Sequence, residues 1–213
     1  MYLFARSARL GPGNVRDSMV WSANITEKVN QISELDVSLW TTVFSPGLGT
    51  LVWTAAVEHL SVLEATDAKL AADDVYISLV EEGAKYLSAD PIDDVLLQLV
   101  FADEDAANSQ PQYASVVASA LAPGNSTRGI ELGVEIAQRA KRITGRPTSF
   151  GVASTGPYGG VEWISLYDSV DQLQKAEADI AADAGFTQFV DKEASTAYNA
   201  ALPTIQTIYR RIV

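Results

Sequence analysis

The sequence predicts an α+β fold built from one unit that occurs twice in tandem. Two blocks of residues recur at spacings of 111 and 110 positions, strand-like and helix-like segments follow the same order in both copies, and a polar stretch separates the copies. A fixed period of this length indicates repeated supersecondary units. We therefore expect a first repeat over residues 1–101, a linker over 102–112 and a second repeat over 113–213.

The repeated residues carry this argument. In the first block, at a spacing of 111, the matches are Tyr2, Leu10, Pro12, Gly13 and Asn14 with Tyr113, Leu121, Pro123, Gly124 and Asn125. In the second block, at a spacing of 110, they include Gly49, Trp53, Leu63 and Asp73 with Gly159, Trp163, Leu173 and Asp183. The change of one position implies a single inserted or deleted residue between the blocks.

Each copy opens with a strand and a helix. Residues 2–9 and 113–120 have the period-2 alternation of strands. A Leu-x-Pro-Gly-Asn turn follows in both copies, and its Asn14 or Asn125 is expected to cap a helix that runs to about Ile32 or Ile143.

A hairpin, two helices and a closing strand complete each copy. Glycine-rich turns join strands over 37–44 and 51–57, and over 149–154 and 161–167. Capping boxes predict that the next helix begins at Ser61, with Glu64, and at Asp171, with Gln174. Further helical stretches cover 75–87 and 186–198, and the closing strands cover 95–101 and 204–212.

This order of elements is the split β-α-β order of ferredoxin-like units. A four-stranded sheet with helices on one face leaves its other face uncovered, and both copies carry large apolar residues on both strand faces, such as Trp40 and Trp53. We therefore expect the two sheets to form one pseudo-dimeric eight-stranded barrel, which at that size is filled or holds one small ligand.

In this element order the chain resembles the dimeric α+β barrel superfamily, particularly tandem fused members related to NIPSNAP-like proteins and antibiotic-biosynthesis-type monooxygenases. The motif residues that carry the resemblance are Gly49 with Trp53, Gly159 with Trp163, and the Ala-Ala-Asp segments 71–73 and 181–183. The resemblance implies the barrel fold for nearly the whole chain. It also implies that the chain could process a small molecule, as the haem-degrading and cofactor-independent members do.

Composition excludes several kinds of partner. The net charge of -12 argues against binding a phosphate backbone, so no nucleic-acid partner is expected. There are no cysteines, hence no disulfide, thiolate metal site or cysteine nucleophile. No apolar run is long enough for a membrane span or a signal peptide. We expect a cytoplasmic protein, or one within an intracellularly assembled particle, with no membrane partner.

Four residues are candidates for lining a ligand cavity: Trp53, Trp163, Tyr167 and His59. His59 is the only histidine, and it follows a strand end where a barrel mouth could lie, but the second copy has Ser169 in its place. The two duplicated tryptophans are interpreted first as packed core and second as ligand contacts. Acidic pairs such as Asp93-Asp94, and the run 103–105, lack metal-ligand spacing and are interpreted as solvated surface and linker. No catalytic residue, metal site or cofactor is predicted.

Two functions remain open. The missing catalytic signature favours a non-catalytic binding or assembly protein, with self-association or a place in a larger particle or virus-associated assembly. The alternative is a cofactor-independent monooxygenase, or another enzyme that processes haem or a small molecule, with a small apolar ligand in an aromatic cavity. An open cavity with converging polar groups would favour the alternative.

Overall fold

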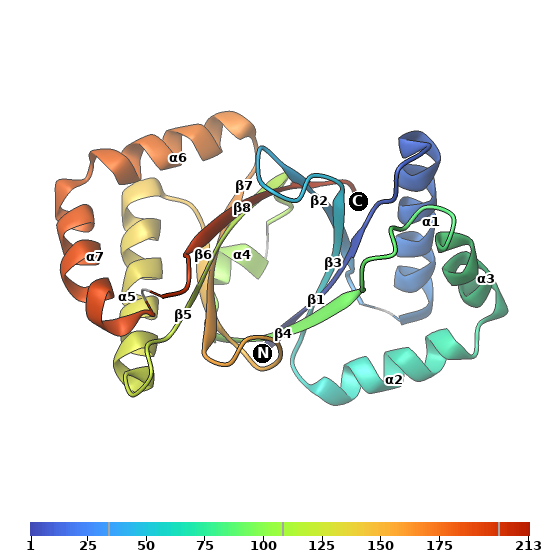
Figure 1. Ribbon diagram of the computed structural model, residues 1–213, viewed down its shortest axis with the longest axis horizontal. Helices are drawn as coiled ribbons and strands as arrows, with labels where there is room; N and C mark the ends of the chain where they lie inside the picture. Colours follow the sequence, from blue (N-terminus) through green and yellow to red (C-terminus); the bar gives the residue numbers. More distant parts are fainter. Residues whose placement is uncertain (34, 108, 200) are drawn as a thin grey trace. The chain divides into compact units, whose positions relative to one another are not determined.

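The computed structural model of the protein describes residues 1–33, 35–107, 109–199 and 201–213 (Figure 1). Residue 108, inside the expected linker, lies outside the described residues. The order of elements is the predicted one, repeated twice, with one short added helix between the copies.

In the first copy the strands lie close to the predicted ranges. The strands are β1 (Tyr2–Arg9), β2 (Ser38–Val43), β3 (Thr50–Val57) and β4 (Asp93–Phe101). The helices are α1 (Val15–Ser33), α2 (Leu60–Ala71) and α3 (Asp74–Gly83).

The second copy has the same elements. Its strands are β5 (Tyr113–Ala120), β6 (Thr148–Ala153), β7 (Gly160–Tyr167) and β8 (Ile205–Arg211). Its helices are α5 (Ser126–Thr144), α6 (Val170–Ala182) and α7 (Ala184–Ala197), and the added helix is α4 (Glu104–Ala107).

Within the described residues, the strands form a closed eight-stranded barrel in the order β1-β3-β2-β8-β5-β7-β6-β4. The predicted α+β barrel of tandem ferredoxin-like units is thereby confirmed. The chain also forms two compact units, which we describe separately: unit 1 is residues 1–96 with 211–213, and unit 2 is residues 97–210.

The strand register repeats with the sequence period. In unit 1 Trp53 on β3 is opposite Arg6 on β1, and in unit 2 Trp163 on β7 is opposite Val117 on β5. Val117 follows Arg6 by 111 positions and Trp163 follows Trp53 by 110. Because a one-residue slip would turn every side chain to the other face, this agreement places equivalent residues on equivalent sheet faces.

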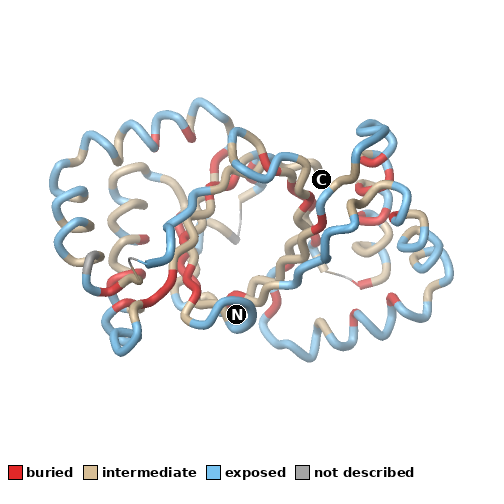
Figure 2. Tube along the Cα trace, in the orientation of Figure 1, coloured by how far each residue is buried: buried red, intermediate tan, exposed pale blue. Residues whose placement is uncertain are grey.

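In each unit, helices cover one face of the strands (Figure 1). The tryptophan lies on that face, because Trp53 Nε1 binds Thr26 of α1 and Trp163 Nε1 binds the Gly133 carbonyl of α5. The buried residues are concentrated along the strands and on the helix sides turned toward them (Figure 2). The core of unit 1 is a cluster of Trp21, Ile25, Leu39 and Leu51. The main core of unit 2 contains Ala137, Phe150, Val161 and Trp163. Among the helices of the described ranges, none has the length and apolar character that a bilayer crossing needs.

The expected capping boxes are wrong by one or two residues. Helix α2 begins at Leu60 with His59 as its N-cap, and the His59 side chain makes no capping hydrogen bond. Helix α6 begins at Val170, where the Ser169 hydroxyl accepts a hydrogen bond from the backbone N–H of Gln172. The Gln172 side chain accepts one in return from the backbone N–H of Asp168. Ser169 therefore provides in unit 2 the cap that imidazole does not provide in unit 1.

The motif aspartates at the next helix start are true caps in both copies. Asp73 accepts a 2.8 Å hydrogen bond from the backbone N–H of Tyr76, and Asp183 accepts one of 2.7 Å from Phe186. Each bond satisfies a donor that the first helical turn leaves free. The repeated Ala-Ala-Asp segments thus have a structural role at the junction of two helices.

The expected solvated linker contains a buried carboxylate. Asp103 is 3% exposed and accepts hydrogen bonds from the Lys141 ammonium at 2.7 Å and from the backbone N–H groups of Asp105 and Thr148. Burial alone would raise the pKa of Asp103, but these hydrogen bonds outweigh it and lower the pKa. The interpretation of 103–105 as solvated is therefore wrong for Asp103, which holds the start of this segment to α5 and β6.

Candidate functional site

Unit 1 contains a cavity of about 510 Å³ between the helix-covered face of its sheet and helices α1, α2 and α3. Ligand pockets of proteins have volumes in this range. Most of its wall is apolar, and the apolar lining residues are Phe4, Ala8, Trp21, Ile25, Val29, Leu35, Val37, Trp53, Ala55, Leu63, Leu70, Val80, Leu87 and Ile92. The polar lining residues are Arg6, Glu64, Thr66, Asp67, Tyr76 and Asp94.

Two indole rings form a rigid aromatic part of the wall. Trp21 and Trp53 meet edge to face, with ring centroids 6.3 Å apart and an angle of 81° between the planes. Trp21 Nε1 donates a hydrogen bond to the carbonyl oxygen of Leu79, and Trp53 Nε1 donates one to Oγ1 of Thr26. Because both indole N–H groups are bound within the protein, the rings present carbon surface to the cavity.

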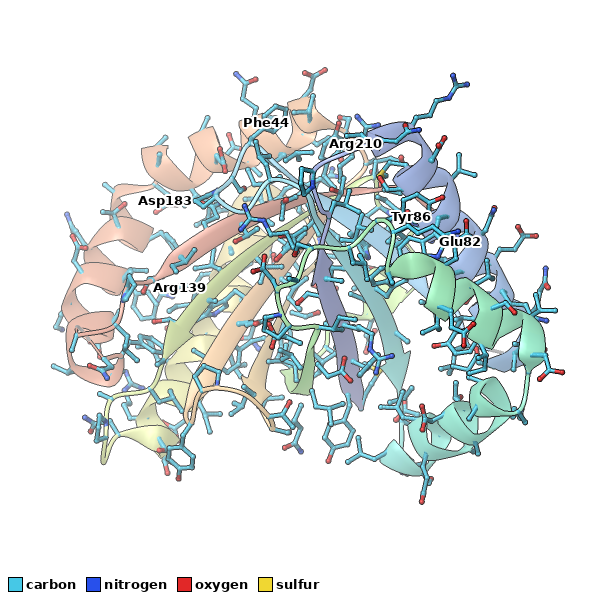
Figure 3. All side chains as sticks on the ribbon, turned by 45° about the vertical axis from the view of Figure 1, so that its right-hand side comes forward. Phe44, Glu82, Tyr86, Arg139, Asp183 and Arg210 are labelled. Carbon is cyan, nitrogen blue, oxygen red and sulfur yellow. The ribbon has the colours of Figure 1, made fainter. Side chains whose placement is uncertain are left out.

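A tyrosine ring packs against Trp21 of this aromatic wall. The ring of Tyr86 lies 5.7 Å from that of Trp21, and its hydroxyl donates a 3.2 Å hydrogen bond to Glu82. Figure 3 shows Tyr86 and Glu82 side by side at the end of α3. This contact links the orientation of Trp21 to the end of α3.

The polar end of the cavity is organised by an ion pair between β1 and β4. Arg6 donates from Nε and from Nη2 to the two carboxylate oxygens of Asp94, both at 2.7 Å. This hydrogen bond to Asp94 is the main reason why the pKa of Arg6 is raised, so the guanidinium is permanently charged. The pair is half exposed and contributes little stability, but its fork geometry fixes the guanidinium plane. Arg6 Nη1 makes no hydrogen bond to any described residue.

Tyr76 and Asp67 lie close enough to Arg6 to alter its electrostatics. Burial raises the pKa of the Tyr76 hydroxyl, and the nearby carboxylates of Asp67 and Asp94 add to the effect while Arg6 opposes it. The hydroxyl is therefore protonated at neutral pH and can donate a hydrogen bond. Within the described ranges, neither this hydroxyl nor the Asp67 carboxylate has a hydrogen-bond or ion-pair partner.

The arrangement can bind a flat apolar molecule and hold an oxygen atom at one end. The aromatic wall provides stacking surface, and Arg6 and Tyr76 both line the cavity with donors that the described protein groups leave unused. A cationic donor beside a neutral one stabilises negative charge on a bound oxygen, which favours the ionised form of a phenol or enol.

Unit 2 places its matching tryptophan in a packed core. Trp163 is 8% exposed, its ring lies 5.2 Å from Phe150 and 5.3 Å from Tyr198, and its Nε1 donates a 2.8 Å hydrogen bond to the carbonyl oxygen of Gly133. Phe150 is fully buried and lies opposite Trp163 in the β6–β7 ladder, where unit 1 has the smaller Leu39 opposite Trp53. The second copy therefore uses aromatic side chains to fill the space beside its tryptophan.

The structure does not bring the four predicted site residues together. Trp53 lines the unit 1 cavity. Trp163 belongs to the unit 2 core, and Tyr167 is buried in a separate cluster with Leu173 and Ala176. His59 is exposed at the start of α2 and is not among the described residues that line the cavity.

Sequence reasoning missed Arg6, Asp67, Tyr76 and Asp94. Asp94 is exposed, as the sequence predicts, and it also lines the cavity and binds Arg6. A signal was present in the repeat itself, because Arg6 stands where the second copy has Val117 and Tyr76 stands where it has Phe186. Both copies have the same fold, but only the first has these polar groups. The fold therefore does not require Arg6 or Tyr76 at these positions. Among the described residues, no group of three or more histidine or acidic side chains is arranged to hold a metal ion.

Comparisons with known proteins identify the fold. No family model matches the chain, and no curated protein matches it significantly. A candidate monooxygenase from Fusobacterium nucleatum aligns over 100% of this chain and 92% of its own, with a TM-score of 0.72 and 7% identity. A candidate monooxygenase from Lactobacillus acidophilus aligns over 99% and 93%, with a TM-score of 0.65 and 7% identity. A heme-binding protein from Thermus thermophilus aligns over 100% and 91%, with a TM-score of 0.55 and 8% identity.

At these identities the likeness concerns the fold alone. The solved structures that match this chain also include a candidate chlorite dismutase, with a TM-score of 0.60 and 8% identity. The chain therefore has the dimeric α+β barrel fold, in a form in which one chain supplies both halves.

Proposed function

We propose that the protein is a cofactor-independent monooxygenase, and that the unit 1 cavity binds its aromatic substrate. The observation that carries the proposal is the cavity itself: about 510 Å³, walled by Trp21, Trp53 and Phe4, with Arg6 and Tyr76 at its polar end. Structural neighbours that are named as monooxygenases support the proposal. They favour it over the binding or assembly role that the sequence analysis put first.

In the proposed reaction, the electrons that reduce O₂ come from the substrate itself. Arg6 and Tyr76 bind the oxygen of a phenol or enol and favour its ionised form, and the released proton passes to solvent at the exposed end of the cavity. The electron-rich anion reduces O₂. A CH₂ group of the substrate becomes C=O, one atom of O₂ enters the product, and the other leaves as water with the two hydrogens. Substrate and O₂ therefore balance product and water without an added reductant.

Haem does not fit the residues present. A haem iron needs an axial ligand such as histidine, and the chain's single histidine, His59, is exposed outside the described lining of the cavity. We therefore derive no step through haem.

The test is oxygen uptake by the purified, chelator-treated protein with polycyclic phenols and enols such as anthrone and naphthols. We expect one O₂ consumed per substrate, with one ¹⁸O atom from ¹⁸O₂ in the product by mass spectrometry. Ala55→Phe should abolish uptake because Ala55 lines the cavity, and Ala56→Phe is the matched control because Ala56 is exposed on the other face of β3. Binding without oxygen uptake would instead support a non-catalytic binding protein, and no binding would reject the cavity as a site.

A further inference from the structure

The lining of the unit 1 cavity carries an excess of negative charge. Its lining contains three carboxylates, from Glu64, Asp67 and Asp94, and one cation, Arg6. The charges therefore sum to -2 (one positive and three negative). Since Asp94 already takes two hydrogen bonds from Arg6, the surplus resides on Asp67 and Glu64 of α2.

The matching carboxylate of unit 2 has a partner that unit 1 lacks. Glu177, 110 positions after Asp67, accepts a 3.0 Å hydrogen bond from Gln206 Nε2, which also donates to Ser115 at 2.9 Å. Gln206 is opposite Val117 in the β5–β8 ladder, and Val117 is the match of Arg6. Gln206 follows Asp94 by 112 positions, as Pro203 follows Pro91, and it lies beside the match of Arg6 as Asp94 lies beside Arg6 itself.

Unit 1 has Asp94 in place of Gln206, so it lacks the side-chain N–H that binds Glu177 in unit 2. Asp94 carries no N–H and is tied to Arg6, so it cannot bind Asp67 as Gln206 binds Glu177. The carboxylate of Asp67 is left at the cavity wall with no partner among the described residues. A charged hydrogen-bonding group at the edge of an apolar pocket fixes the orientation of a ligand that supplies the complementary group.

We infer that the cavity selects an aromatic ligand that carries a protonated amino group, and that Asp67 receives this group. The inference rests on the proposed function, because it concerns the same cavity. The ammonium binds Asp67, the rings pack against Trp21 and Trp53, and the ligand's oxygen meets Arg6 and Tyr76. A carboxylate in place of the ammonium, next to Asp67 and Glu64, is repelled by them.

Three ligands of one shape test the inference: 6-(aminomethyl)-2-naphthol, 2-naphthol and 6-hydroxy-2-naphthoate, titrated by calorimetry at pH 7. We expect the amine to bind at least about tenfold more tightly than the neutral naphthol, and the carboxylate more weakly than both. Asp67→Asn should reduce affinity for the amine to that of the naphthol and leave the naphthol unchanged. The matched control is Glu177→Gln, which alters the bonded carboxylate of unit 2 and should leave the preference intact.

The outcomes separate the two proposals. Equal binding of amine and naphthol, an unchanged preference in Asp67→Asn, or the same loss in Glu177→Gln would each overturn the inference while the aromatic site stands. Failure of all three ligands to bind would reject the site itself, and the proposed function with it.

Discussion

Trp163 and Gly133 are joined by a 2.8 Å hydrogen bond from the indole Nε1 to the glycine carbonyl oxygen, which ties β7 to α5 in the core of unit 2. The matching Trp53 binds the side chain of Thr26 instead and lines a cavity. The same repeated residue therefore has a packing role in one unit and a place in a candidate site in the other.

Trp163→Ala should lower the free energy of unfolding by about 3 to 5 kcal/mol, because it removes a large buried ring and leaves a cavity. Trp53→Ala should cost less, about 1 to 3 kcal/mol, since its ring already faces open space. Urea unfolding followed by circular dichroism measures both. Equal losses would contradict the difference in packing between the two rings.

Gly133→Ala should destabilise the protein by about 1 to 3 kcal/mol through overpacking. A Cβ at this position would lie 2.2 Å from Cζ of Phe150, which is fully buried and cannot move aside. The control is Ser22→Ala at the matching position of α1, where a Cβ is already present and only a hydroxyl bound to the Met19 carbonyl is lost. Thermal unfolding should separate the two variants, and a Gly133→Ala protein as stable as the parent would contradict the close packing.

Asp103 should make stability depend on pH in the acid range. Its pKa in the folded protein is below the value of about 3.9 for an unfolded chain. Its contribution is therefore fully present above pH 4 and is lost as the pH falls through the folded pKa. Asp103→Asn should cost about 1 to 3 kcal/mol at pH 7 and flatten the dependence below pH 4. Urea titrations from pH 7 to pH 3 give the comparison, and parallel curves for the two proteins would count against this role.

His59→Ser should stabilise the protein by about 0.5 to 1 kcal/mol, because serine can provide the N-cap hydrogen bond that His59 does not make. Ser169→Ala should lose about 1 kcal/mol, since it removes the cap of α6. Ligand binding should be unchanged in His59→Ser. A loss of binding or of oxygen uptake would assign His59 to the site and reverse our placement of it.

Tyr76→Phe should reduce oxygen uptake about 10 to 100-fold in kcat while stability changes by less than about 0.5 kcal/mol. The hydroxyl binds no described residue, so its removal breaks no contact within the described protein. Steady-state oxygen electrode measurements, with unfolding curves beside them, give both quantities. A large loss of stability with unchanged kcat would show that the hydroxyl serves packing and not the reaction.

The fold could be predicted because the duplication is visible in the sequence. Matching Tyr2 to Tyr113 and Trp53 to Trp163 fixed the element order, and strand alternation placed most bounds within two residues. Helix starts were harder, because Ser61 fits a cap pattern better than His59 does and Asp171 fits one as well as Ser169 does. The burial of Asp103 depends on Lys141 and Thr148, which are far away in sequence.

Only one member of the candidate site could be predicted. Trp53 stands out in the sequence as a repeated aromatic residue. Arg6, Asp67 and Tyr76 come from a strand and two helices, and only the tertiary fold brings them together. Taken one at a time, they are ordinary surface residues. They become informative only when each is compared with its match in the other copy.

The unequal pair of residues Leu39 and Phe150 has a genetic consequence. When a symmetric assembly is made from two copies of one chain, every substitution appears twice, so a bulky ring that improves the packing of one subunit is imposed on the other as well. Joining the copies in a single reading frame removes that coupling. Selection can then keep Phe150 and Gly133 for packing in one half while Arg6 and Asp67 diverge in the other, so the half with the candidate site can change independently of the other half.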